Sequence, residues 1–329
     1  MPSIHRRPAD QAIVVRLALI AASCVLASYP ATSNAQVPDA APAPGEAIAG
    51  RSVAAADEDS LPGKAAGPFA YLERSGFDLD QRNALIIGAS SAAFLAYGHA
   101  KWWDQGFGGG FKTRGEGWFG RGTDYGGTDK LGHMFTNYAS VRLLSRAFRA
   151  AGNGADESVR LAAWTTIGIF TGIEVLDGFS RKWRFSGEDA LMNIAGAGLG
   201  VLMEDQPELD AKFDFRFGYR RSTGSRFDPF GDYAGQRYLL MAKADGFESL
   251  RRHPVLRYLE VGIGYQARFT PGGERRRDAY VGVSLNLSRL LADGFYGGRH
   301  GTTPFQRGAD LAFELVQFPA AGYVRHRID

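Results

Sequence analysis

The period of the apolar residues changes near residue 212, and this change constrains the fold more than any other feature. From about 78 to 204, apolar and small residues recur with the period of a helix. Beyond that point they alternate with polar residues, most clearly at 259–269 and 280–287, with the period of two that is typical of β-strands. Separate helical and strand segments predict an α+β fold, with a glycine-rich four-helix domain followed by a small antiparallel β-sheet.

Start and stop signals divide the helical segment. The expected helices, with their N-caps, are Asp80 to about Trp103, 129–150 after Thr128, about 156–176, and 187–203 after Ser186. The last two are apolar on nearly all faces, but each apolar run has only about 14 to 17 residues, fewer than the ~20 that cross a bilayer. They are either short or tilted membrane helices or the core of a compact bundle, and we favour a compact bundle at the membrane surface.

Glycines recur at a spacing of four in both apolar helices. The pairs are Gly168 with Gly172 and Gly196 with Gly200. Because glycine has no Cβ, such pairs predict that two helix backbones approach each other closely.

The second half predicts a sheet built around a hairpin. The segments 259–269 and 280–287 form the hairpin, with a turn at 270–277, and further strands are expected at 213–220, 236–243 and 311–318. About five strands are too few for an outer-membrane barrel, which needs at least eight. We therefore expect one sheet on the helical domain.

The N-terminus has the pattern of an export signal. Basic residues precede the apolar stretch from Leu17 to Ser28, and the small residues around Asn34 suit cleavage after Ala35. An alternative is lipoprotein processing at Cys24. These signals divide the chain into a signal peptide at 1–35, a disordered linker rich in Ala, Pro and Gly at 36–77, a helical domain at 78–204 and a β-rich domain at 205–329.

Composition excludes several function classes. Cys24 is the only cysteine, so the cleaved protein has no disulfide, no cysteine nucleophile and no cysteine-ligated zinc. The formal net charge is only +3, and no basic run resembles a nucleic-acid footprint, so we expect no nucleic-acid partner.

Polar residues stand out inside the otherwise apolar helical half. They are Asp129 and His133, Glu174 and Asp177, and Ser186, Asp189 and Asn193. Asp129 with His133 and Asp189 with Asn193 are each four residues apart, so each pair shares a helix face. A carboxylate in apolar surroundings is costly unless it is paired, hydrogen-bonded or protonated. The expected helices can therefore bring these groups into one interior cluster.

Four runs between roughly residues 80 and 204 form a recognisable pattern. They are EGWF at 116–119, DKLGH at 129–133, EVLD at 174–177, and FS at 185–186 followed by Asp189, Asn193, Gly196 and Gly200. The pattern resembles the YfiM-like family of uncharacterised, predicted periplasmic proteins, and more distantly the VanZ-like membrane proteins. The resemblance implies an exported protein, commonly a lipoprotein, and it implies no particular activity.

Three interpretations of the polar cluster remain open. In a catalytic site, His133 is the general acid or base, Asp129 orients it, Glu174 is the second carboxylate, and water attacks an envelope lipid or glycan. In a metal site, His133, Glu174 and Asp189 bind a divalent ion as a cofactor. In the third, the cluster only fixes helix packing.

We therefore expect an exported, periplasmic, membrane-associated protein whose partner is a membrane surface or an envelope lipid. Whether it is an enzyme is left open by the sequence. The rival hypothesis is a non-catalytic structural or scaffolding protein of the envelope. Asp177, Ser186 and Asn193 belong to the polar cluster in either case.

Overall fold

The computed structural model describes residues 76–120, 122–269, 275–319 and 321–328, together with Phe69, Leu72 and Arg74. The signal peptide predicted at 1–35, the alternative lipidation at Cys24 and most of the linker predicted at 36–77 lie outside the described residues.

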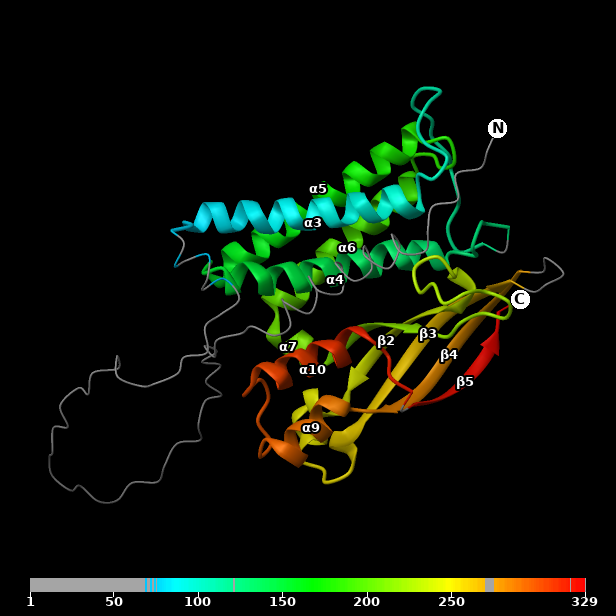
Figure 1. Ribbon diagram of the computed structural model, residues 1–329. Coiled ribbons are helices and arrows are strands. Elements are labelled where there is room, and N and C mark those ends of the chain that lie inside the picture. Colours follow the sequence, from blue (N-terminus) through cyan, green and yellow to red (C-terminus); the bar gives the residue numbers. More distant parts are fainter. Residues whose placement is uncertain are drawn as a thin grey trace, which may run out of the picture.

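The described chain is α+β, as the change of apolar period predicts (Figure 1). Its long helices come first and are α3 (Leu79–Lys101), α4 (Thr128–Ala150), α5 (Ala155–Phe179) and α6 (Gly187–Asp205). Helix α4 contacts the sheet, while α3 and α5 lie further from it. The polar residues singled out in the sequence come from α4, α5 and α6, and from Ser186, the residue just before α6.

A five-stranded antiparallel sheet follows, with its strands paired in chain order. The strands are β1 (Phe213–Tyr219), β2 (Gln236–Lys243), β3 (Leu259–Phe269), β4 (Arg275–Leu285) and β5 (Ala321–Arg327). The predicted hairpin is β3 with β4, and Ile263 pairs with Val281 in its register. The predictions for β1 and β2 are also confirmed, and β5 is a strand that the sequence did not reveal.

The short helices of the second half are α7 (Pro207–Asp210), α8 (Glu248–Arg251), α9 (Leu287–Phe295) and α10 (Pro304–Leu315), with 3-10 turns η2 (Tyr233–Gly235), η3 (Ala244–Gly246) and η4 (Leu256–Tyr258). The strand predicted at 311–318 is wrong, because most of this segment is the end of α10. Thr303 caps α10 and Pro304 starts it, and the helix turns Leu311 and Leu315 into the core. Apolar residues at 311, 313 and 315 also fit a period of two, which caused the error.

Two of the predicted helix starts are wrong. Helix α3 is capped by Asp78, whose carboxylate accepts the N–H of Gln81 while the Gln81 side chain accepts the N–H of Asp78, so Asp80 is not the cap. Helix α4 begins after Gly127, whose φ of 84° is left-handed. Thr128 is not a cap, because its Oγ1 accepts the backbone N–H of Ala267 in β3 at 3.1 Å. Ser186 does cap α6, as predicted.

Helices α4 and α6 touch through glycine, as predicted for Gly196 and Gly200. A Cβ on Gly196 would lie 2.0 Å from the carbonyl oxygen of Met134, and one on Gly200 would lie 2.7 Å from the Cβ of Val141. The same prediction is wrong for Gly168 and Gly172. A Cβ added to either of these glycines would meet nothing within 4 Å, and both are exposed on α5.

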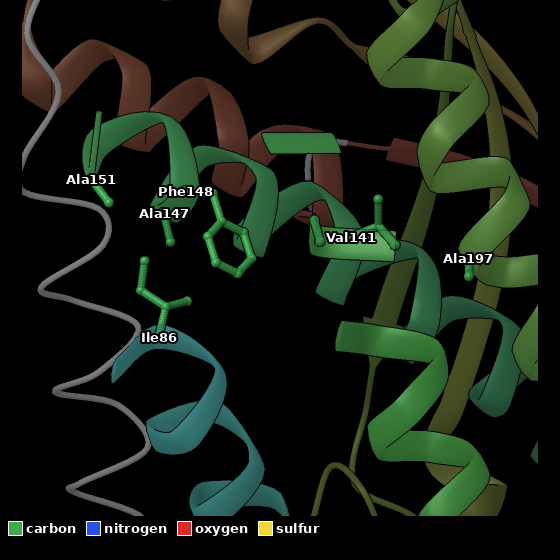
Figure 2. Packing of buried hydrophobic residues seen from close by; sticks show 7 residues of the cluster. Ile86, Val141, Ala147, Phe148, Ala151 and Ala197 are labelled. Atoms are coloured by element: carbon green, nitrogen blue, oxygen red, sulfur yellow. The ribbon is translucent and has the colours of Figure 1, made fainter. Parts of the chain in front are cut away.

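Two clusters of the core lie around α4, and a third joins Trp103, just after α3, to Phe170 and Ile173 of α5. At the C-terminal half of α4, Phe148 and Ala147 pack against Ile86 of α3, which points toward them in Figure 2. On the sheet side, Tyr138 packs with Phe215 of β1 and Tyr238 of β2. Because α4 is packed on both sides, most of its polar side chains are also buried.

Helix α5 is the described helix that is long and apolar enough to cross a membrane. Its most apolar window has a mean hydropathy of 1.3, and 44% of that window is buried inside the protein. A core helix passes the same test. Length and composition therefore do not distinguish a span from a packed helix here.

Candidate functional site

A buried lysine holds three carboxylates at the start of α4. The side chain of Lys130 is 1% exposed, and its Nζ lies 2.6 Å from Glu116, 2.9 Å from Asp129 and 2.8 Å from Asp189. Glu116 belongs to the loop before α4, whereas Asp189 belongs to α6. One ammonium group therefore ties together a loop and two helices.

His133 lies one turn further along α4, between two more buried acids. Its Nδ1 is 3.6 Å from Glu174 of α5, and its Nε2 is 3.7 Å from Asp189 of α6. The imidazole side chain is 29% exposed, while Glu174 and Asp189 are 3% and 8% exposed. The ring thus separates solvent from two buried carboxylates. We call the residues around Lys130 and His133 the His133 cluster: Glu116, Asp129, Lys130, His133, Asn137, Glu174, Asp177, Asp189 and Asn193.

Hydrogen bonds assign the tautomer of His133. The Oδ1 of Asn193 accepts from Asn137 Nδ2 at 2.6 Å and lies 3.1 Å from Nδ1 of His133. Since that oxygen only accepts, Nδ1 carries a proton. In the neutral imidazole the lone pair is then on Nε2, on the side of Asp189. A neutral His133 therefore presents a base there.

Two amide atoms in the cluster are buried without a hydrogen-bond partner among the described residues. They are Nδ2 of Asn193 and Oδ1 of Asn137. Buried polar groups are nearly always satisfied, and an exception in a native structure calls for a role. A donor and an acceptor beside His133 suit a polar group bound there.

Burial raises the pKa of two acids in the cluster. Desolvation, with the negative charges of Asp189 and Asp177, raises the pKa of Glu174 to about 7, although His133 opposes this. Desolvation also raises the pKa of Asp177 to about 6, against the hydrogen bond that Trp103 Nε1 donates at 2.6 Å. Glu174 is therefore an acid that exchanges its proton near pH 7.

His133 and Asp189 shift in the directions expected of an ion pair. Burial lowers the pKa of His133, but the charges of Asp189, Glu174 and Asp129 outweigh burial and raise it above the ordinary value. Burial likewise opposes ionisation of Asp189, yet His133 and Lys130 lower its pKa. Asp189 is accordingly the charged acid of the cluster, while Glu174 holds a proton more readily.

The sheet holds the loop that carries Glu116. Arg277 donates to the carbonyl of Phe119, Arg275 to that of Thr123, and the Tyr265 hydroxyl to that of Gly126. These three side chains come from the β3–β4 hairpin. Together with the bond from Ala267 to Thr128, they attach the loop and the first turn of α4 to the sheet. The second half of the chain therefore positions the site.

All of the residues singled out in the sequence lie at this end of the helices. Ser186 caps α6 and accepts the N–H of Asp189 at 3.2 Å. Asp129 bonds Lys130, and no hydrogen bond between Asp129 and His133 is found among the described residues. Glu116, Lys130, Asn137 and Trp103 were not among the predicted site residues. Lys130, His133 and Asn137 are three and four residues apart, so their common helix face was a usable signal.

In the part of the chain that the structure describes, two groups of ligand atoms are close enough to hold a metal ion. One is His133, Glu174 and Asp189, and the other is Glu116, Asp129 and Asp189, with all atoms of a group within 4.8 Å of one another. The ammonium of Lys130 already bridges the second group. The first group is the one whose donors, an imidazole and two carboxylates, suit a divalent cation.

A comparison with known protein families matches the part of the chain that holds the His133 cluster. The model of a family described as "Predicted periplasmic lipoprotein (DUF2279)" matches residues 115–205, from the loop before Glu116 to the end of α6. The matched stretch contains the His133 cluster, and the description is consistent with an exported, membrane-associated protein, as expected from the sequence. No curated protein and no solved structure matches the chain.

Proposed function

We propose that the protein works at a membrane surface of the cell envelope and that its His133 cluster transfers protons on a polar group of an envelope lipid or glycan. The observation that carries the proposal is the position of the His133 ring. It reaches solvent on one side and faces Glu174 and Asp189 on the other.

The protonation states support acid–base chemistry. A general acid or base is most efficient when its pKa lies near the working pH. Glu174, with a pKa of about 7, meets this condition, and the neighbouring acids raise the pKa of His133 above its ordinary value. In this arrangement Asn193 orients the neutral imidazole through Nδ1, Asp189 stabilises the imidazolium once Nε2 is protonated, and Glu174 supplies or receives the second proton.

The attacking group in such a reaction is water. Ser180 and Ser186 are each three residues from an acid of the cluster, but both are buried and their Oγ atoms are engaged, Ser180 with the N–H of Trp183 and Ser186 with the N–H of Asp189. With its lone pair on Nε2, neutral His133 can remove a proton from water. The unpartnered amide atoms of Asn137 and Asn193 would then fix the polar group of the substrate.

Exposed apolar side chains support action at a membrane. Large ones protrude from the three outer helices of the first half: Leu85, Ile87 and Leu95 on α3, Trp164, Val175 and Phe179 on α5, and Leu191, Ile194 and Leu202 on α6. Trp164 is 69% exposed and Ile194 is 55% exposed. Apolar surface of this extent marks a binding face, and together with the family match it favours a lipid surface.

The experiment is an incubation with envelope extract. Purified protein is mixed with total envelope lipids and glycans, and mass spectrometry compares the products with those of His133→Ala. We expect a species that appears only with the unchanged protein and is reduced at least 100-fold by His133→Ala, a size typical for loss of a general base. Identical extracts, with both proteins equally folded, would exclude the reaction and leave the scaffolding hypothesis.

A divalent metal is the second candidate function of the same residues, because the donor atoms of His133, Glu174 and Asp189 lie within 4.8 Å of one another. Elemental analysis after gentle purification should then find about one equivalent of a divalent ion. Adding Mn²⁺ or Zn²⁺ at ~100 times its Kd should stabilise the fold by about 2.7 kcal/mol. The Glu174→Gln variant should lose this shift. An unchanged melting curve would end the metal hypothesis without touching the acid–base one.

A further inference from the structure

Two loops at the end of the helices that holds the His133 cluster lie side by side (Figure 1). One connects α3 to α4, and the other connects α5 to α6. The N–H of Lys112 donates to the carbonyl of Gly178 at 2.8 Å, and the N–H of Phe185 donates to the carbonyl of Lys112 at 3.0 Å. Arg181 donates in the same way to Gly106 at 3.0 Å. The backbone hydrogen bonds make one continuous surface from the two loops.

Basic side chains gather on this surface. We call them the cationic collar: Lys112, Arg114, Arg181, Lys182 and Arg184. Arg114 pairs with Asp124, and Lys182 pairs with Asp104 at 3.5 Å. In the described part of the chain, no carboxylate lies within ion-pair distance of Lys112, Arg181 or Arg184. Lys112 and Arg181 are exposed, while Arg184 is half-buried and donates from Nη1 to the carbonyl of Trp183 at 2.6 Å. Cations left without an acid on such a surface are available to an anionic partner.

Exposed aromatic rings lie among these cations. Phe107, Phe111 and Trp118 of the first loop are 43%, 47% and 44% exposed. Phe179, at the end of α5, is 43% exposed and stacks edge-to-face on Phe111, with 5.2 Å between ring centroids. Trp103, by contrast, is buried and bonded to Asp177, so it is a core residue. The pattern of exposed aromatics beside lysine and arginine is that of side chains at a membrane–water interface.

The collar adjoins the mouth of the candidate site. Glu116 follows Arg114 by two residues, and the N–H of Gly117 donates to Glu188 in the first turn of α6. The apolar outer face of α5 reaches the same end, at Val175 and Phe179. A surface that binds the collar would therefore lie next to the exposed edge of His133.

From this charge complementarity we propose that the cationic collar binds the anionic phospholipid headgroups of a bilayer, with the exposed aromatic rings inserted at the interface. The inference deepens the proposed function, on which it rests for the membrane-surface setting, by naming the lipid class and the residues that select it. Attraction falls off within a Debye length of an anionic surface, so binding should weaken steeply with salt.

The test uses the full chain and vesicles of two compositions. Flotation is measured with vesicles of phosphatidylcholine and with vesicles that also contain phosphatidylglycerol. We expect binding to the anionic vesicles only. Lys and Arg near an anionic surface each contribute several-fold, so the triple variant Lys112→Gln/Arg181→Gln/Arg184→Gln should bind roughly 100-fold more weakly. The matched control is Arg160→Gln/Arg251→Gln/Arg252→Gln, which removes three exposed arginines elsewhere and should bind as the unchanged protein does.

Three further measurements keep the inference exposed to failure. Raising the salt concentration from about 0.05 to about 0.5 M should release the unchanged protein from the anionic vesicles. This measurement does not depend on whether the variants fold. Inorganic phosphate should release the protein from the vesicles no better than chloride at equal ionic strength. A far stronger effect of phosphate would indicate a site for free phosphate and not for a membrane surface. The His133→Ala variant should float unchanged, which separates this inference from the proposed chemistry. Equal binding to both vesicle types, or full binding by the triple variant, would overturn it.

Discussion

Helix α4 carries two buried polar clusters, and they differ in how their charges are balanced. Near its start, the His133 cluster sets five carboxylates (Glu116, Asp129, Glu174, Asp177 and Asp189) against Lys130 and His133. In its second half, Arg142, Arg146 and Arg149 meet Glu204, Asp210 and Glu314. We call the second group the Arg142 network. It has as many cations as acids.

The balance decides which groups titrate near neutral pH. Arg142 is 2% exposed and lies 3.1 Å from Glu204, 2.7 Å from Asp210 and 2.8 Å from Glu314. Burial opposes ionisation of Glu314, but the charges of Arg142 and Arg146 outweigh burial and hold its pKa to about 2. Glu174 has no comparable partner, and its pKa rises to about 7. The surplus of acid therefore makes the His133 cluster the one that titrates near neutral pH, as the proposed chemistry requires.

The Arg142 network is thus an internal standard for a structural role. It joins α4 to α6 and α10, as the His133 cluster joins α4 to α5 and α6. If the His133 cluster only fixed helix packing, its variants should behave like those of the Arg142 network. The following substitutions test whether the two clusters respond alike.

The largest effect is expected from Arg142→Ala. Removing the guanidinium leaves three acids without their main cation, and breaking a buried pair costs about 3–5 kcal/mol of the unfolding free energy. Urea denaturation at pH 7 measures this loss. Arg146→Ala is the control, because Arg146 is 23% exposed and pairs with Glu314 alone, at 3.2 Å. Its expected cost is below about 1 kcal/mol. A similar small cost for both would mean that the network does not hold the helices together.

Much of this architecture follows from local sequence signals. The change of period near 212 predicts α+β, and the cap at Ser186 and the alternation in 259–269 predict their elements within a few residues. Strand β5 was missed because its sequence, AGYVRHR, has little apolar alternation, and most of it is exposed at the sheet edge. Such a strand is defined by its pairing with β4 and not by its own pattern.

The site was predictable in its members but not in its electrostatics. His133, Glu174 and Asp189 could be proposed because polar residues in apolar helices need partners. The burial of Lys130 depends on Glu116, which lies in a loop 14 residues earlier, and on Asp189 in another helix. Contacts of that range leave no local trace. Gly196 and Gly168 show the same limit, since both are spaced alike but only one faces a helix.

A matched pair of Glu→Gln changes should give effects of opposite sign. In Glu174 the folded-state pKa is raised, so the native state binds more protons than the unfolded state between about pH 4.5 and 7, and stability falls as pH rises through that window. Glu174→Gln removes the titrating group, so the fall in stability between about pH 4.5 and 7 disappears. Relative to the unchanged protein, the variant should gain on the order of 3 kcal/mol between pH 4 and pH 8.

In Glu314 the pKa is lowered to about 2, so its stabilisation is complete above about pH 4.5 and is lost as pH falls toward 2. Glu314→Gln should therefore destabilise by on the order of 3 kcal/mol at pH 7, and less at pH 3. Urea denaturation of both variants from pH 3 to 8 makes the comparison. If both substitutions changed the unfolding free energy in the same direction, the two clusters would be alike, which would favour the structural interpretation of the His133 cluster.

The smallest effect, about 1–3 kcal/mol, is expected from overpacking at Gly196→Ala. The new Cβ would lie 2.0 Å from the Met134 carbonyl oxygen, so α6 must move away from α4. Asn137 and Asn193 have short side chains, so this movement would lengthen their hydrogen bond, now 2.6 Å, and displace the amide beside His133. By contrast, the long side chains of Arg142 and Glu204 can follow the movement.

The control is Gly198→Ala, which has nothing within 4 Å and should be neutral or stabilising by up to about 1 kcal/mol. Gly196→Ala should therefore shift the titration of His133, followed by NMR, while leaving that of Glu314 in place. If the titrations of His133 and Glu314 shifted equally, α6 would move as a rigid body, and the two clusters would depend on the same helix contact.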